Sequence, residues 1–375
     1  MSEPLPEPTT GAVRRTLAYG RADLLVREEP LLLVVHGQQL LTMRTPGRDE
    51  DLALGFLLGE VLLGLGHAVL SGPPSALLYE TLAEHGQQHR FLAIESRLSA
   101  LRLLGTGSAF LLGGALAHLG GGAAYGATIV ATCVGNVVAT LLALQLRAGA
   151  PRAQLRARAF AGEVGRELRK PAVAWLLGYW VVLFALLRFP FHNYQPYLLA
   201  AGELVPLLHE PLFAGALFAA LNLGAAPLSA LVPRLVARWG RRPLFWGMPL
   251  LLCASMAVMA AERWRAETGS GTAMMAWLAV AMFFLQQVPF GMHWALLQEF
   301  VNHRIGPAVR TTVLSALSLG ARAVYAGVNV LLFHLQAERG LSTAFLVTAV
   351  AGIGATTAAM WLRPRGLLRG QGPLD

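Results

Sequence analysis

The sequence predicts an all-α membrane protein: a helical bundle of eight or nine transmembrane segments with a short α/β soluble fragment near its N-terminus. Two observations predict this class, namely long apolar runs from Leu98 onward and loops whose arginine content alternates. Each run is long enough to cross a hydrocarbon core, which needs roughly 20 helical residues. The eight runs are Leu98–Leu119, Ala123–Leu146, Pro171–Phe189, Pro211–Val232, Pro243–Ala261, Thr272–Leu297, Thr311–Leu335 and Leu341–Leu362.

The composition excludes an ordinary soluble domain of this length. Hydrophobic residues make up 55% of the chain, charged residues make up 14%, and the mean hydropathy is +0.52. The net charge of +9 raises the question of a nucleic-acid partner. However, the basic residues lie at the ends of apolar runs, without the interleaved aromatic residues of a nucleic-acid surface. We therefore expect the lipid bilayer, and no nucleic acid, as a partner.

The two cysteines lie in different apolar runs. Cys133 and Cys253 form no C-x-x-C motif and have no metal-ligand spacing. We expect both thiols to be buried and unreactive. The sequence thus predicts no metal site, no cofactor and no enzymatic centre.

The basic loops predict the orientation, because Arg and Lys resist translocation and collect on the cytoplasmic side. The loop 147–170 holds seven basic residues, and every second connection after it is also basic. The residues expected inside are Arg147, Arg152, Arg156, Arg158, Arg166, Arg169, Lys170, Arg234, Arg238, Arg241, Arg242, Arg304, Arg310, Arg363, Arg365 and Arg369. The intervening loops hold only Arg263, Arg265 and Arg339. We expect a multi-pass protein with a cytoplasmic C-terminus.

The chain before the first apolar run has a different character. Residues 1–13 are rich in Pro, Glu and Thr and are expected to be disordered. Within 14–63, Leu31–Val35 and Leu40–Met43 are typical of two strands joined by a turn, and Asp49–Leu63 is typical of a helix with acidic residues in its first turn. This segment is too short to bury a core of its own.

Four motifs in that segment point to a known family. They are Arg27–Leu31, Val35–Gly37, Thr42–Gly47 and Glu50–Glu60. Together they resemble the start of the formate dehydrogenase accessory sulfurtransferase family, FdhD. The resemblance implies a sulfur atom carried by a cysteine pair further along the chain. Nothing after Leu63 continues the pattern and that pair is absent, so sulfur-carrying chemistry is not expected.

From residue 64 onward the chain resembles a second family. The motifs are Ser71–Leu82, Phe191–Leu198 and Arg310–Ser315. They are similar to segments of the major facilitator superfamily of secondary transporters. The resemblance implies that the eight runs are helices five to twelve of a twelve-helix bundle, with a partial N-terminal lobe over 64–146, a basic linker over 147–170 and a C-terminal lobe over 171–375. Leu52–Leu70 is apolar enough to be a ninth span, which would place the N-terminus outside.

This second resemblance implies transport of a small solute, with coupling to protons, across the inner (plasma) membrane of a bacterium by a truncated carrier. Two alternatives stay open. One is a non-transporting membrane remnant or scaffold that arose from a gene fusion or an assembly error. The other is a sulfur carrier for formate dehydrogenase maturation, which the absent cysteine pair disfavours.

Arg322 is the sharpest candidate for a substrate site. It lies near the middle of an apolar run, where a charge costs at least about 2.5–3.5 kcal/mol. Tyr325 and Asn329 follow it by three and seven residues and so share its helix face. We expect a cavity-facing cation for an anionic substrate or a counter-carboxylate. The alternative is a guanidinium bound to backbone carbonyls at a helix break near Gly320 and Gly327.

Polar side chains in other runs are further pathway candidates. Proline next to them disfavours regular helix, and irregular backbone at membrane depth is typical of a cavity wall. The alternative is that they hold helices together. Arg102 is a further candidate, although it and Arg188 are expected to extend to membrane interfaces. No acidic residue lies deep in any of the eight runs. The remaining candidates are Asn193, Tyr194, Gln195, Asn222, Gln286, Gln287 and His293.

The loop 233–243 is similar to the signature gating loop of facilitators. The residues that match are Arg238, Gly240, Arg241 and Arg242. Ala237 stands where the signature has Asp, so the charge relay that latches the helix ends is not expected.

Overall fold

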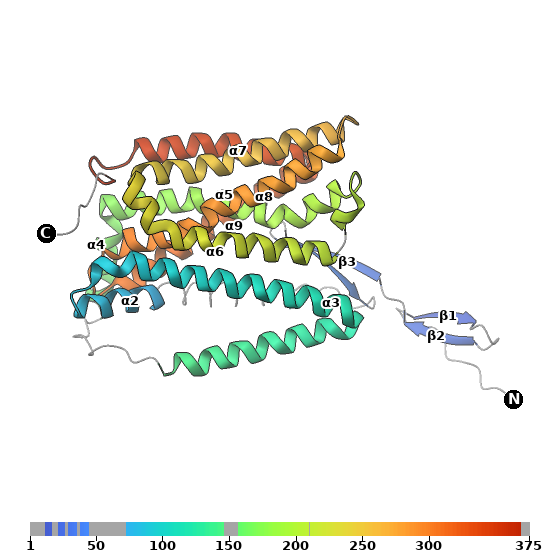
Figure 1. Ribbon diagram of the computed structural model, residues 1–375, viewed down its shortest axis with the longest axis horizontal. Coiled ribbons are helices and arrows are strands. Elements are labelled where there is room, and N and C mark those ends of the chain that lie inside the picture. Colours follow the sequence, from blue (N-terminus) through green and yellow to red (C-terminus); the bar gives the residue numbers. More distant parts are fainter. Residues whose placement is uncertain are drawn as a thin grey trace. The chain divides into compact units, whose positions relative to one another are not determined.

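The computed structural model describes residues 12–16, 22–26, 29–35, 38–44, 73–145, 157–209 and 211–368 (Figure 1). The chain divides into two units, Met1–His67 and Ala68–Asp375. The expected helix Asp49–Leu63 and the candidate span Leu52–Leu70 lie outside the described residues.

The first unit contains two antiparallel pairs of strands. Strand β1 (Ala12–Thr16) pairs with β2 (Ala22–Val26), and β3 (Glu29–Val35) pairs with β4 (Gln38–Arg44). The second pair contains the predicted hairpin, and its register places Leu32 opposite Leu41. Strand β1 includes Ala12 and Val13 of the segment expected to be disordered, because these residues pair with the end of β2.

The second unit is a bundle of long helices. Six of the helices that the structure describes are long and apolar enough to cross a membrane: α3, α5, α6, α7, α8 and α9. Two short helices, α2 and α4, and two 3₁₀ turns, η1 and η2, join them. In chain order the elements are α2 (Pro73–Glu84), η1 (Gln88–Arg90), α3 (Phe91–Ala143), α4 (Ala157–Arg169), α5 (Pro171–Ala201), η2 (Pro206–His209), α6 (Pro211–Trp239), α7 (Arg241–Glu267), α8 (Ala273–Asn302) and α9 (Arg310–Trp361).

The eight predicted runs map onto these six helices, because α3 and α9 each carry two runs. In α9 the two runs lie on either side of Gly340, whose φ of 85° interrupts the helix at a conformation that favours glycine. Figure 1 shows the ribbon of α3 reversing direction between its two runs. The second run of α3 exposes Val130, Val134 and Leu141, as a lipid-facing helix does.

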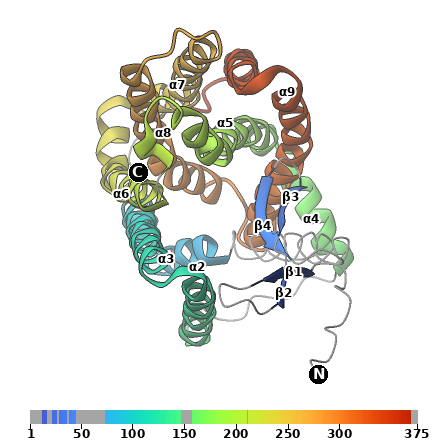
Figure 2. The same cartoon turned by 90° about the vertical axis from the view of Figure 1, so that its right-hand side faces the viewer.

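Helix α5 lies at the centre of the core. It contacts α7, α8 and α9, and Figure 2 views the helices end-on with α5 between them. Close packing elsewhere depends on small residues: a Cβ added at Gly291 of α8 would lie 2.5 Å from the carbonyl oxygen of Ala225 on α6. Such close approach is typical of helix pairs in membranes, where small residues let backbones meet. This packing fixes which residues of α5, α8 and α9 face inward.

Candidate substrate site

Arg322 and Arg188 lie over the same aromatic ring. The Arg322 guanidinium carbon is 5.5 Å from the centre of the Phe184 ring, and that of Arg188 is 5.3 Å from it. Arg188 also lies 5.6 Å from the ring of Phe191, and Arg322 donates to the Ser318 hydroxyl at 3.5 Å. The two charges, one from α5 and one from α9, are close enough to act on each other.

Arg188 lies deeper in its helix than the predicted run implied. That run ended at Phe189, but α5 continues to Ala201 through Pro190 and Pro196. Arg188 is therefore near the middle of its helix. Proline is tolerated inside membrane helices, where neighbouring helices can satisfy the freed backbone groups.

A hydrogen bond joins α5 to α9 beside the two arginines. The Tyr325 hydroxyl lies 2.9 Å from Nδ1 of His192, and the Tyr325 ring meets Phe184 edge-on at 5.6 Å. Tyr325 and Asn329 are both buried, so the predicted face of α9 does point inward. His192 was missed as a candidate, because only its place in a family-like motif was noted.

Arg102 lies on α3, and its surroundings are partly acidic. Its guanidinium is 4.9 Å from the centre of the Trp294 ring and donates to the Ser99 hydroxyl at 3.2 Å. The Trp294 indole donates to the carboxylate of Glu95 at 3.0 Å, and Glu95 and Arg102 attract each other. Because α3 begins at Phe91, Arg102 lies about three turns into the helix. The helix begins before the predicted run at Leu98, so Arg102 lies deeper in it than the run implied.

His293 of α8 feels the charges of arginines on two other helices. Its Nδ1 is 2.7 Å from the Phe290 carbonyl, and the charges of Arg102 and Arg188 both act on its ring. His293 is thus within electrostatic range of both α3 and α5.

Three other predicted residues form a buried hydrogen-bonded network. The Tyr194 hydroxyl donates to Gln286 at 2.7 Å and accepts from Gln287 at 3.4 Å, and Gln286 donates to Ser255 at 2.9 Å. The network joins α5, α7 and α8. The arrangement suits helix-to-helix bonding as well as a pathway wall.

The remaining predicted residues do not converge. Asn193 and Asn222 donate to carbonyls one turn back in their own helices, those of Phe189 and Phe218, each at 2.9 Å. Gln195 is exposed. The buried Oδ1 of Asn193 has no hydrogen-bond partner within the described part of the chain.

A buried acidic residue lies near the end of α7, directly after the predicted run. Glu262 follows the predicted run Pro243–Ala261, but α7 continues to Glu267 and leaves Glu262 only 2% exposed. The Tyr197 hydroxyl on α5 donates to its carboxylate. Arg263, expected in a loop, is buried beside the same tyrosine, 5.8 Å from its ring centre.

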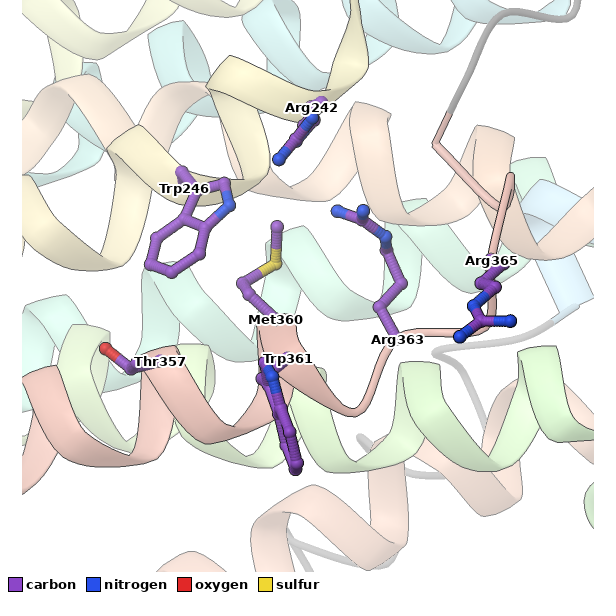
Figure 3. Close-up of a pocket in the computed structure, with 7 residues that line it drawn as sticks. All are labelled: Arg242, Trp246, Thr357, Met360, Trp361, Arg363 and Arg365. Atoms are coloured by element: carbon purple, nitrogen blue, oxygen red, sulfur yellow. The ribbon is translucent and has the colours of Figure 1, made fainter.

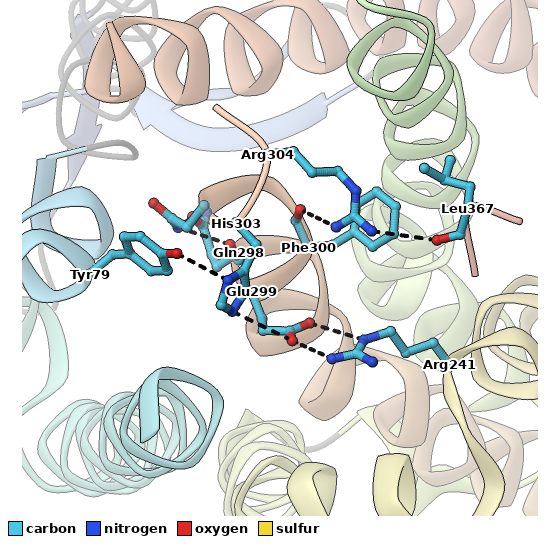
Figure 4. Close-up of polar contacts among 9 residues, drawn as sticks. Tyr79, Arg241, Gln298, Glu299, Phe300, His303, Arg304 and Leu367 are labelled. Carbon is cyan, nitrogen blue, oxygen red and sulfur yellow. Dashed lines mark hydrogen bonds and ion pairs between the residues drawn. The ribbon is translucent and has the colours of Figure 1, made fainter. Parts of the chain in front are cut away.

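The loop between α6 and α7 is latched by a carboxylate from another helix (Figure 4). Arg241 forms an ion pair with Glu299 of α8, and His303 lies 3.9 Å from the same carboxylate. Glu299 thus supplies the negative charge that we did not expect in the absence of an Asp at Ala237. Glu299 was missed because the apolar run ends at Leu297, whereas α8 continues to Asn302.

Three contacts join α2 to residues beside this latch. The Tyr79 hydroxyl lies 3.0 Å from Nδ1 of His303, and Glu80 lies 3.5 Å from Arg310 at the start of α9. Arg310 also lies over the Tyr79 ring at 4.4 Å. We call Tyr79, Arg241, Glu299, His303 and Arg310 the latch cluster. Burial lowers the pKa of His303, and Arg241 lowers it further against the opposing effect of Glu299.

The other gating-loop residues lie away from the latch cluster. Arg238 is exposed, and Gly240 makes the turn into α7 with a φ of 74°. Arg242 lines a pocket of about 330 Å³ at the start of α7 and the end of α9 (Figure 3). The other lining residues are Trp246, Thr357, Met360, Trp361, Arg363 and Arg365.

The cysteines differ from each other in environment. Cys253 is buried in α7, but Cys133 is exposed on α3, so the expectation of two buried thiols is wrong for Cys133. Among the residues that the structure describes, no group of three or more His, Cys, Asp or Glu could hold a metal ion.

Curated relatives match only a small part of the chain. The sulfur carrier protein FdhD of Nocardia farcinica (strain IFM 10152) is 52% identical over 52 residues, which are 14% of this chain and 19% of that protein. FdhD of Anaeromyxobacter dehalogenans (strain 2CP-C) is 53% identical over 55 residues, again 14% and 19%. The chain therefore spans about a fifth of the length of the curated relatives it matches.

A protein family covers much more of the sequence. The family model described as Major Facilitator Superfamily matches residues 35–328. That range includes Arg102, Arg188, His293 and Arg322. It extends further toward the N-terminus than the resemblance from residue 64 implied. The chain belongs to the Major Facilitator Superfamily.

Proposed function

We propose that this protein is a carrier that moves a small solute across the bacterial inner membrane, coupled to protons. One observation supports the proposal most: arginine, histidine and tyrosine side chains of α5 and α9 meet at mid-helix. These are Arg188, His192, Arg322 and Tyr325. Charges at membrane depth are costly, and they commonly mark a substrate or ion pathway.

Glu262 is the carboxyl group that we propose for the coupling. It is buried, it accepts a hydrogen bond from Tyr197, and one of its oxygens has no partner among the described residues. Carboxyl groups inside transporters serve as proton relays. Tyr197 belongs to α5, the helix that also carries Arg188. Protonation of Glu262 would therefore alter a contact of the helix that carries part of the substrate site.

The test is uptake into inverted membrane vesicles over a broad panel of labelled solutes, with and without an imposed pH gradient. We expect at least one solute to accumulate only with the gradient. Glu262→Gln should remove the gradient dependence, because the amide cannot titrate, whereas Glu338→Gln on an exposed part of α9 should leave it unchanged. Equal accumulation by wild type and Glu262→Gln would contradict the coupling role.

The latch cluster is proposed as the cytoplasmic gate. It joins α2 on one side to α8 and α9 on the other, and α2 contacts both of these helices. Ion pairs that bridge separate elements can form and break as those elements rock. The arrangement supports a state in which the cytoplasmic side is closed.

The orientation proposed from the basic loops has its own test. Reporter fusions at Ala153, Arg238 and Gly370 should all report cytoplasm, because Arg and Lys cluster in those segments. Fusions at Glu203 or Gly269 should report the outer side. A periplasmic signal from Ala153 would overturn this topology.

Sulfur transfer is the second candidate, and the matches to FdhD favour it. We expect the purified protein to show no persulfide transfer. We also expect the double variant Cys133→Ser, Cys253→Ser to retain its solute uptake, because one thiol is exposed on α3 and the other is buried in α7, on different helices. Sulfur transfer that disappears in the double variant would favour this candidate over the carrier.

A further inference from the structure

We infer that Arg188 and Arg322 together bind a small oxyanion, a carboxylate or a phosphate, between α5 and α9. The inference rests on the proposed carrier function and assigns the class of solute that it moves. Both guanidinium groups lie over Phe184, at 5.3 and 5.5 Å from the centre of its ring. A guanidinium that stacks on a ring keeps its N–H edge available for a planar, bidentate acceptor.

In the described part of the chain, neither the Arg188 nor the Arg322 guanidinium group has a carboxylate partner. No ion pair is formed there by Arg188 or Arg322, and they repel each other. The latch cluster provides the contrast, because its arginines Arg241 and Arg310 do have carboxylate partners. An interaction with an aromatic face does not neutralise a cation. An anion between the two arginines would relieve their repulsion.

Both arginines lie too deep for a lipid headgroup to be the natural ligand. Arg188 is 13 residues from the end of α5 and Arg322 is 12 residues from the start of α9. At about 1.5 Å per residue, each lies roughly 20 Å from the nearer end of its helix. That depth favours a solute that enters the bundle over a phospholipid at the interface.

The other side chains around the pair also favour an anion. Tyr325 and His192 form a hydrogen-bonded pair beside it, and whichever of the two accepts that bond keeps its own O–H or N–H to donate to an oxygen. On α3 and α8, Arg102 adds a third positive charge near His293, and Glu95 offsets that charge in part. The described surroundings therefore carry a positive excess.

The test is thermal stabilisation of the purified protein in detergent at low salt. The anions are inorganic phosphate, sulfate, succinate and glutamate, and the controls are glycerol and choline. We expect at least one anion to raise the unfolding temperature and the controls to leave it unchanged. Arg188→Gln and Arg322→Gln should each weaken that binding at least tenfold, and Arg265→Gln, at an exposed position, should not.

A second readout separates ligand binding from a structural role. Removing either positive charge relieves repulsion, so both variants should unfold without anion at the wild-type temperature or above it. A lower temperature combined with full anion stabilisation would overturn the inference. So would equal stabilisation by glycerol, or stabilisation by none of the four anions.

The same assay with vesicles of an anionic phospholipid distinguishes a lipid headgroup from a free anion as the ligand. Stabilisation by phosphatidylglycerol vesicles, but by none of the free anions, would overturn the assignment to a solute. Anion binding without any uptake would support this inference and count against the carrier. Gradient-driven uptake of a neutral solute, without anion binding, would support the carrier and overturn this inference.

Discussion

Replacing Arg322 with Ala should abolish solute uptake while expression and membrane insertion stay nearly normal. The physical reason is its position: mid-helix, over Phe184 and beside Arg188, in surroundings where a charge is costly to keep. Arg322→Lys should restore uptake only in part, because Lys lacks the planar fork that binds an oxyanion bidentately. The measurement is the initial uptake rate at equal amounts of inserted protein.

Arg265→Ala is the matched control, since Arg265 is exposed and lies outside the substrate site. It should transport at the wild-type rate. If Arg322→Ala also transports at that rate, Arg322 is structural and its guanidinium serves only to pack on Phe184.

Replacing Glu299 with Gln should lower the free energy of unfolding by about 3 kcal/mol, the scale for removing one partner of a buried ion pair. Glu299 is 5% exposed and holds Arg241 with two hydrogen bonds, so its loss leaves a partly buried cation without its partner. Chemical denaturation in detergent measures the change. Glu84→Gln on the exposed face of α2 should change stability little, and an equal effect of both variants would contradict the latch.

The latch cluster also predicts how stability depends on pH. Burial lowers the pKa of His303 in the folded protein below the value of about 6.5 expected for an unfolded chain. The unfolded state therefore binds more protons over that interval, and stability falls as the pH drops below about 6.5. His303→Gln should flatten the fall between about pH 7 and pH 5. If stability depends on pH in this variant as it does in the wild type, groups other than His303 cause that dependence.

The sequence could predict which face of α9 points inward, since Arg322, Tyr325 and Asn329 recur with the period of a helix. It could not predict Arg188 as their neighbour. Proline normally ends a helix in water, so the run was closed at Phe189. In the bundle, α5 continues past Pro190, and this moves Arg188 from the expected end of a span to its middle.

Glu262 and Glu299 escaped prediction for a related reason. Each follows the last residue of an apolar run, where composition marks the end of a span. The helices continue by several residues, and neighbouring helices bury both carboxylates. That burial comes from tertiary contacts between residues distant in sequence, such as Tyr197 with Glu262, and local patterns do not contain it.

Solute counterflow in reconstituted liposomes tests the carrier most directly, because it needs no driving force and no coupling ion. Liposomes are preloaded with an unlabelled oxyanion that stabilises the protein, and labelled anion is added outside at trace concentration. We predict transient accumulation of label with wild type and none with Arg322→Ala. If folded wild-type protein matches empty liposomes for every stabilising anion, the protein does not move the anions that it binds, and the account of an oxyanion carrier is wrong.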